Sequence, residues 1–106
     1  MRDANCVEIS GRLIELEQLR YTPAGIPILR FRLGHFSDQQ EAGAARKVEC
    51  ELSVVAIQRE AQLIASATLG TPLIASGFLD RKSRSSSQLM LHATHIEFKN
   101  PGLGEK

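Results

Sequence analysis

The chain has 106 residues and a hydrophobic content of 42%, which suits one compact domain with a single core. Its formal net charge of +1 excludes attraction of polyanions by bulk charge, so nucleic-acid binding would need local clusters of Arg and Lys. The first residues lack the continuous apolar stretch of a signal peptide, and no segment approaches the ~20 apolar residues of a membrane span.

The two cysteines, Cys6 and Cys50, bear on the compartment. In a chain without an export signal they are most simply reduced thiols, so we expect a cytoplasmic protein that does not bind a membrane. Cys50 lies among apolar neighbours in VECELSVVA and is predicted to be a small core residue.

Three strands are predicted in the first half of the chain. VEISGRLIEL (7–16) alternates apolar and polar residues and contains a glycine, which is typical of a bulge or sharp bend. RYTPAGIP (20–27) has the prolines and glycine of a turn or loop, and ILRFRLGHF (28–36) alternates again. We expect a long polar loop at 37–47, followed by a third strand at 48–56.

The period changes in the second half. In IQREAQLIASATLG (57–70), apolar residues recur at helical spacing, and Gly70 is placed to end the helix. PLIASGFL (72–79) and LMLHATHIEF (89–98) are predicted strands, joined by the serine-rich, cationic segment DRKSRSSSQ (80–88). The last residues, NPGLGEK, are expected to fray.

The resulting order, three strands, one short helix and two strands, predicts an all-β fold. It is the layout of the OB-fold, a five-stranded Greek-key barrel with a helix between the third and fourth strands. We expect residues 1–106 to form a single OB-fold domain with a structured core of about 7–98. In such folds the loop after the first strand and the loop between the last two strands flank the ligand face.

Signals of catalysis are weak in this sequence. The histidines of HATH, His92 and His95, are three apart, so on a regular strand they point to opposite faces and could share one ion only across a bulge. No phosphate-binding glycine loop is present, and the serines of 83–87 have no neighbouring histidine or glycine elbow. We therefore expect neither an enzyme nor a bound metal or cofactor.

The pattern of cations and rings is more informative, because a curved barrel would gather these residues on one side as a cradle for a polyanion. Cations that follow phosphates and rings that stack on bases are what single-stranded nucleic acid requires. The candidate DNA-binding residues are Arg20, Tyr21, Arg30, Arg32, Phe36, Arg46, Lys47, Arg81, Lys82 and Arg84.

A plain solvated surface is the alternative interpretation of the same residues. Exposed Arg and Lys on strands usually serve solubility, and Glu49 and Glu51 lie on the proposed ligand face, where they would repel phosphate. Carboxylates among cations also suit a mixed-charge surface that docks another protein, with DNA contact incidental.

An ordered set of short motifs resembles the primosomal replication protein N (PriB) family. The set comprises SGRL (10–13), YTPAGIP (21–27), FRLGH (31–35), EAG (41–43), GFL (77–79) and LMLHATHIE (89–97). The resemblance implies a homodimeric OB-fold that binds single-stranded DNA, assists restart of stalled replication forks and contacts the PriA helicase, and in some bacteria DnaT. By place in the motifs, it implies DNA contacts by Arg20, Phe36, Arg81, Lys82 and Arg84.

The chain departs from the pattern of this family at two positions. Glu49 stands where some relatives carry a tryptophan, and Ala44 stands where an aromatic residue is sometimes found. A carboxylate in place of a stacking ring removes attraction and adds repulsion toward phosphate, so we predict weaker DNA binding than in tryptophan-bearing relatives. A dimer would also cover open strand edges, with Ile14, Ile74 and Met90 as candidate outward apolar contacts.

Overall fold

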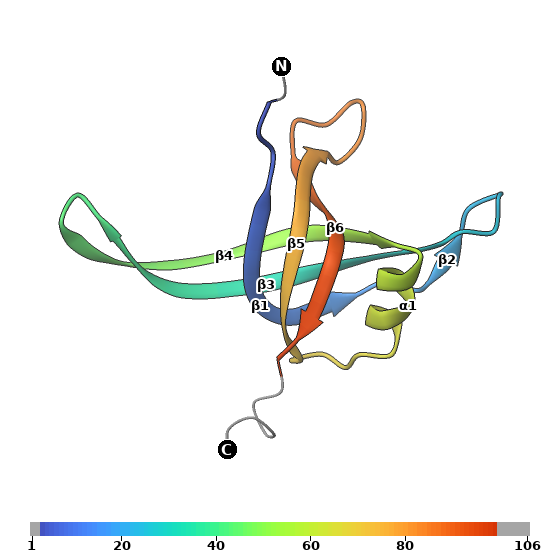
Figure 1. The fold of residues 1–106 in the computed structure, drawn as a ribbon, viewed down its shortest axis with the longest axis horizontal. Helices are drawn as coiled ribbons and strands as arrows, with labels where there is room; N and C mark the ends of the chain where they lie inside the picture. Colours follow the sequence, from blue (N-terminus) through green and yellow to red (C-terminus); the bar gives the residue numbers. More distant parts are fainter. Residues whose placement is uncertain (1–2, 100–106) are drawn as a thin grey trace.

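The computed structural model describes residues 3–99, which form one curved sheet closed into a barrel, with one helix (Figure 1). The elements are β1 (Val7–Leu16), β2 (Arg20–Tyr21), β3 (Pro27–Glu41), β4 (Ala44–Ile57), α1 (Arg59–Ala65), β5 (Pro72–Arg81) and β6 (Leu89–Phe98). The sheet order is β1-β5-β6-β4-β3-β2, and a further pairing of β1 with β3 closes the barrel. All pairs are antiparallel except β4 with β6. The five long strands and the helix confirm the predicted OB-fold.

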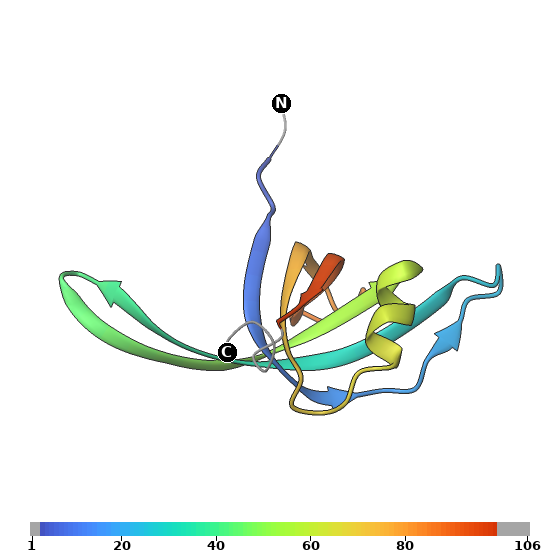
Figure 2. The same ribbon diagram turned by 60° about the horizontal axis from the view of Figure 1, so that its bottom comes forward.

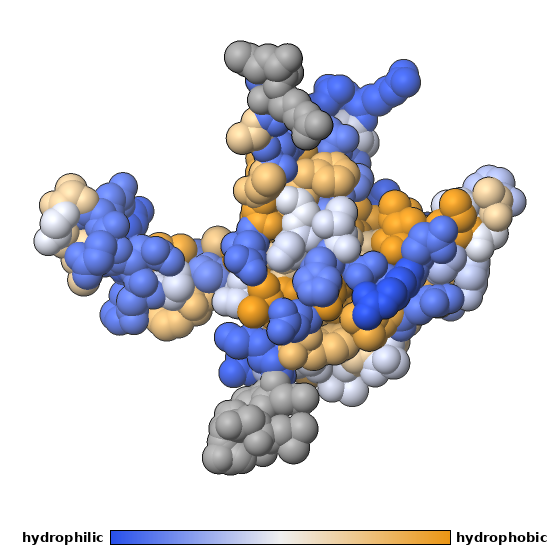
Figure 3. Space-filling model, in the orientation of Figure 1, coloured by the Kyte–Doolittle hydropathy of each residue, from blue (hydrophilic) through white to orange (hydrophobic). Residues whose placement is uncertain are grey.

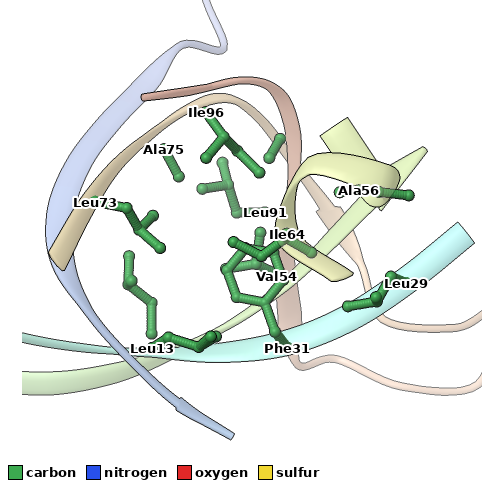
Figure 4. Packing of buried hydrophobic residues seen from close by; sticks show 13 residues of the cluster. Leu13, Leu29, Phe31, Val54, Ala56, Ile64, Leu73, Ala75, Leu91 and Ile96 are labelled. Carbon is green, nitrogen blue, oxygen red and sulfur yellow. The ribbon is translucent and has the colours of Figure 1, made fainter. Parts of the chain in front are cut away.

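The core fills the barrel and is capped by α1. In the barrel part of β3 the odd-numbered residues point inward, as the alternation predicts, and Leu29, Phe31 and Leu33 are at most 2% exposed. They pack with residues from the other strands and with Ile64 of α1 (Figure 4). Burial of this continuous apolar cluster is the main term that stabilises the barrel.

Two glycines allow the strands to approach closely. A Cβ on Gly11 of β1 would collide with the carbonyl oxygen of Gly34, which explains a glycine in this strand. The register irregularity of β1 is two residues further on, between Leu13 and Glu15. A Cβ on Gly77 would collide with the His92 carbonyl oxygen, at the bulge between β5 and β6. Neither position can accept a side chain without moving backbone.

The predicted loop at 37–47 is wrong, because this segment is a β-hairpin. β3 and β4 stay paired up to Glu41 and Ala44, around a two-residue turn in which Ala42 and Gly43 have φ of 54° and 80°. The part beyond the barrel, residues 35–50, projects to one side (Figures 1 and 2) and is called the arm below. Because the arm is polar and has no core beneath it, its sequence lacks the apolar alternation by which strands are predicted.

Three smaller predictions also fail for identifiable reasons. Cys50 is exposed rather than buried, because it lies on the arm. Met90 is 3% exposed, so it is not an outward apolar contact, whereas Ile14 is 40% exposed and Ile74 is half-buried. The helix is shorter than 57–70. It ends before Ser66, and Gly70, with φ of 92°, lies in the following loop.

Within the segment predicted as turn or loop, β2 is a two-residue strand paired with the start of β3. The predicted strands at 7–16 and 89–98 match β1 and β6, and the strand at 72–79 is two residues longer as β5. The predicted frayed end at 100–106 lies outside the described residues.

Candidate nucleic-acid interface

The structure does not bring the ten candidate residues into one patch. They fall into four groups: Arg20 and Tyr21 on β2, Arg30 and Arg32 on the barrel part of β3, the arm residues Phe36, Arg46 and Lys47, and Arg81, Lys82 and Arg84 around the β5–β6 connection. Figure 1 shows the arm, β2 and the β5–β6 connection at three separate extremities of a molecule with a longest extent of 50 Å. The ten candidate residues therefore do not form a single compact binding surface.

Arg30 and Arg32 share the outer face of β3, as predicted, but differ in their partners. Arg32 donates a hydrogen bond from Nη2 to Glu51 Oε1 at 2.7 Å, and its Nε lies 3.6 Å from Glu15 Oε1. The hydrogen bond to Glu51 raises the pKa of the Arg32 guanidinium, so it stays charged while two carboxylates neutralise it. Arg30 forms no ion pair with residues 3–99, and its Nε has no hydrogen-bond partner there.

Both cations of the arm are paired with carboxylates. Arg46 Nη1 lies 3.0 Å from Glu41 Oε1, and Lys47 Nζ lies 3.2 Å from Asp38 Oδ1, its direct cross-strand neighbour. Phe36 is 64% exposed, but its cross-strand neighbour is Glu49. With Glu49 added, three carboxylates of the arm face two cations, so the arm as a whole does not attract phosphate.

The connection between β5 and β6 is different. Residues 81–88, called the cationic loop below, carry Arg81, Lys82 and Arg84, and none of these three forms an ion pair with a described residue. The loop is closed by a hydrogen bond from Lys82 N to the Gln88 carbonyl oxygen at 2.8 Å. Its serines supply further bonds within the loop, such as Gln88 N to Ser86 Oγ at 3.0 Å. Three unneutralised cations are thus held on a short, ordered loop.

At the far end of β3, Arg20 and Tyr21 are both exposed on β2, and Tyr21 is 61% exposed. Arg20 forms no ion pair within the described part of the chain. This pair offers one cation and one ring, at the opposite side of the barrel from the arm (Figure 1).

His92 and His95 both lie on the outer face of β6, whereas His35 lies on the arm. A bulge in β6 leaves Thr94 without a partner on β5, because Ser76 pairs with His95 and Gly77 with Ala93. His92 stacks on Phe78, while His35 hydrogen bonds through both ring nitrogens, to the Ser10 carbonyl oxygen and Ser37 Oγ.

Among residues 3–99, no three His, Cys, Asp or Glu side chains are grouped closely enough to hold a metal ion. The same residues include no helix long and apolar enough to cross a membrane.

An open pocket of about 430 Å³ lies where the arm leaves the barrel. Ile14 and Phe36 supply apolar surface to it, and Glu49 and Glu51 supply carboxylates. Cys50 lies between these two carboxylates in sequence and also lines the pocket. Arg12 and His35 line it as well, and this mixture of apolar, acidic and basic groups suits a protein side chain better than a nucleotide.

Comparisons with known proteins agree with this fold. Residues 5–95 match the family model described as "Another single-strand binding protein family". The chain is 44% identical, over 88 residues, to Replication restart protein PriB of Nitrosomonas europaea, covering 83% of this chain and 82% of that one. This chain belongs to the PriB family of single-strand binding proteins. The PriB family consists of DNA-binding proteins rather than enzymes.

Solved structures extend the likeness. PriB from Ralstonia solanacearum superposes with a TM-score of 0.84 at 32% identity, covering 92% of this chain and all of that one. The single-stranded DNA binding protein from Thermus aquaticus gives 0.74 at 25% identity, covering 95% of this chain and 52% of that one. These matches confirm the OB-fold and the PriB resemblance inferred from the sequence motifs.

One feature of the surface was missed by sequence reasoning, namely the Phe78–His92 pair. The two ring centroids are 5.0 Å apart and the rings are nearly parallel, at 6°. Each residue was visible in a predicted strand, but only the register of β5 against β6 shows that they are direct neighbours. A search for rings in adjacent antiparallel strands on the outer face would have been needed to find them.

Proposed function

We propose that this protein binds single-stranded DNA without sequence preference, and that the cationic loop provides the main attraction. The observation that supports this most directly is that Arg81, Lys82 and Arg84 form no ion pair with a described carboxylate. The loop is also one of the two that flank the ligand face of an OB-fold. Arg30 and Arg20 add further cations without described ion-pair partners, while Arg32, Arg46 and Lys47 contribute less because they are neutralised.

The biological role we propose is replication restart, the role for which its PriB relatives are named. In that role the protein contacts the PriA helicase at stalled forks in the cytoplasm, and in some bacteria DnaT. It acts as a homodimer. One feature supports a second copy: β1 between Val7 and Gly11 pairs only with β5, so its other edge has no strand partner among residues 3–99, although the His35 ring bonds to the Ser10 carbonyl oxygen.

A salt-dependent titration of a fluorescently labelled oligothymidylate tests DNA binding. The triple variant R81A/K82A/R84A is expected to lose about tenfold or more in affinity at about 50 mM salt. The slope of log K against log salt should also become shallower by about two, because three cations are removed and each phosphate contact to a single strand contributes about 0.7.

The matched control is D38A/K47A, which removes one ion pair of the arm without changing the net charge. This variant should bind DNA like the wild type. If the wild type does not bind the oligonucleotide even at low salt, the proposal is wrong. If the two variants lose DNA affinity equally, the cationic loop is not the main source of attraction.

A second function, docking of a protein with DNA contact incidental, is favoured by the pocket at the base of the arm. There Ile14 and Phe36 lie beside Glu49 and Glu51, a mixed surface typical of protein interfaces. Purified PriA discriminates the two functions. If the triple loop variant loses helicase binding while its DNA affinity barely changes, the docking function is the primary one. If DNA affinity falls and helicase binding persists, the loop binds DNA and the helicase uses another surface, for which the pocket is the candidate.

A further inference from the structure

The outer face of the barrel carries a row of side chains that no sequence motif pointed to. Val55 of β4 pairs with Arg30 of β3 on one side and with His92 of β6 on the other, and His92 in turn pairs with Phe78 of β5. Directly paired residues point to the same face of a sheet. Arg30, Val55, His92 and Phe78 therefore form one continuous row across four strands.

Phe78 is the exposed end of this row. It is 41% exposed although the strand around it packs on the core, and one ring face is covered by the stacked His92 ring. Phe78 also lines an open pocket of about 630 Å³ between the start of β1 and the β5–β6 bulge, with Cys6, Ser76 and Thr94 among its other walls. The pocket gives a flat ligand room to lie against Phe78.

Cations lie near both ends of the row, beside two carboxylates: Asp80 is two residues from Phe78 on the same face of β5, and Glu8 lines the pocket. Phe78 lies three residues before Arg81 on the same strand, which is about 10 Å along β5. The cationic loop therefore begins within about two nucleotides of the ring, and Arg30 closes the other end of the row. In Figure 3 most of the apolar surface lies over the barrel, between hydrophilic patches, whereas the arm is mainly hydrophilic.

We propose that Phe78, backed by His92, is a stacking platform for an unpaired nucleobase whose neighbouring phosphates contact the cationic loop. This site rests on the proposed binding of single-stranded DNA and deepens it. Rings on the strands of an OB-fold hold bases regardless of sequence, because every base has a π face. Here the platform supplies a ring on the barrel itself, whereas the exposed ring of the arm, Phe36, has the carboxylate Glu49 as its cross-strand neighbour.

The absence of tryptophan from this chain makes a direct test available. Phe78→Trp places a sole tryptophan at the platform, and its fluorescence reports stacking. An oligothymidylate of about 15 nucleotides should quench this emission strongly, whereas an abasic oligonucleotide of equal length should not. Leu69→Trp, at an exposed position of the loop after α1, is the matched control and should show no quenching by either.

Binding is measured in parallel by anisotropy of the labelled oligonucleotide. Phe78→Leu keeps apolar bulk but removes the ring, and should weaken binding on the order of tenfold while leaving the salt slope unchanged. Its thermal unfolding, compared with wild type, shows whether the fold survives. Phe78→Trp should retain or improve affinity.

Three results would overturn the platform, and they are separable from failure of the proposed function. If the labelled oligonucleotide binds Phe78→Trp without quenching it, or if Phe78→Leu binds like wild type, DNA binding stands and the platform does not. If the tryptophan emission of the Phe78→Trp variant depends on protein concentration and not on DNA, a second copy covers the ring. If the wild type does not bind DNA at all, both proposals fall together.

Discussion

The arm and the cationic loop both project from the barrel and both carry cations, but only the cations of the arm are paired with described carboxylates. In the arm, each cation lies within 3.2 Å of a carboxylate oxygen. In the loop, none of the charged groups of Arg81, Lys82 and Arg84 forms an ion pair with a described carboxylate. The number of cations on a segment therefore says little about its attraction for phosphate until their partners are known.

The difference arises from the backbone of the two segments. An antiparallel ladder fixes which side chains face each other, and in the arm the register sets Lys47 directly opposite Asp38. The loop has no facing strand between Lys82 and Gln88, so its side chains have no imposed neighbour. The paired strands of the arm thus bring opposite charges together, whereas the cationic loop has no facing strand to neutralise its cations.

The largest effect is expected where the loop is anchored to the barrel, at Gly77. Gly77→Ala should destabilise the protein by about 3 kcal/mol or more, because its Cβ would meet the backbone of His92. The loss should be seen in urea unfolding followed by circular dichroism, and DNA binding should fall with it.

The control for this prediction is Gly43→Ala at the tip of the arm. Nothing lies within 4 Å of a Cβ there, and only the positive φ of 80° opposes it, at about 1 kcal/mol. Equal costs at the two glycines would contradict the view that the loop stem is part of the barrel while the arm is peripheral.

The next effect concerns position 49 of the arm, where a carboxylate lies opposite Phe36. Glu49→Trp should raise the affinity for single-stranded DNA by about tenfold, because it removes a carboxylate and adds a stacking surface beside Phe36. Glu49→Gln separates the two causes, since it removes only the charge and should give a gain of only a few-fold. If neither variant binds more tightly in the oligonucleotide titration, the arm does not contact the strand.

Much of the barrel could be predicted from the sequence because its strands bury one face. The alternation of Leu29, Phe31 and Leu33 placed β3, and the same pattern gave β1 and β6 their bounds. The arm could not be found in this way. Its two faces are both polar, so no apolar period marks it, and the remaining signal was the Glu-Ala-Gly-Ala turn between two polar stretches of equal length.

The site was predicted less well, for a related reason. The residue types in the cationic loop were identified, but the ion pairs that neutralise Arg32 and Lys47 depend on register and geometry that the sequence does not display. The same holds for the stacked pair of Phe78 and His92. Whether a cation attracts phosphate depends on whether a carboxylate neutralises it. Such pairs across strands are visible only in the folded chain.

A smaller effect is expected at the boundary between the two regions. Glu51→Gln removes the nearer of the two carboxylates beside Arg32, so the guanidinium is neutralised only by Glu15 and becomes more available to phosphate. DNA affinity should rise a few-fold, and the salt slope should steepen by about 0.7. Stability should change by less than about 1 kcal/mol, because the pair is exposed. An unchanged slope in the titration would mean that this part of β3 lies off the path of the strand.

The smallest effect should be confined to the arm. Ala42 has φ of 54°, which is strained for alanine, whereas Asn tolerates this conformation and Asn-Gly is the favoured sequence of such two-residue turns. Ala42→Asn should stabilise the arm by about 0.5 kcal/mol. The gain should appear as slower amide hydrogen exchange across residues 35–50, because this hairpin pairs only with itself and opens locally. Ala45→Asn, at an exposed strand position, should give no gain. DNA affinity should remain that of the wild type, since the arm attracts no phosphate; a change would show that the two regions act together in binding.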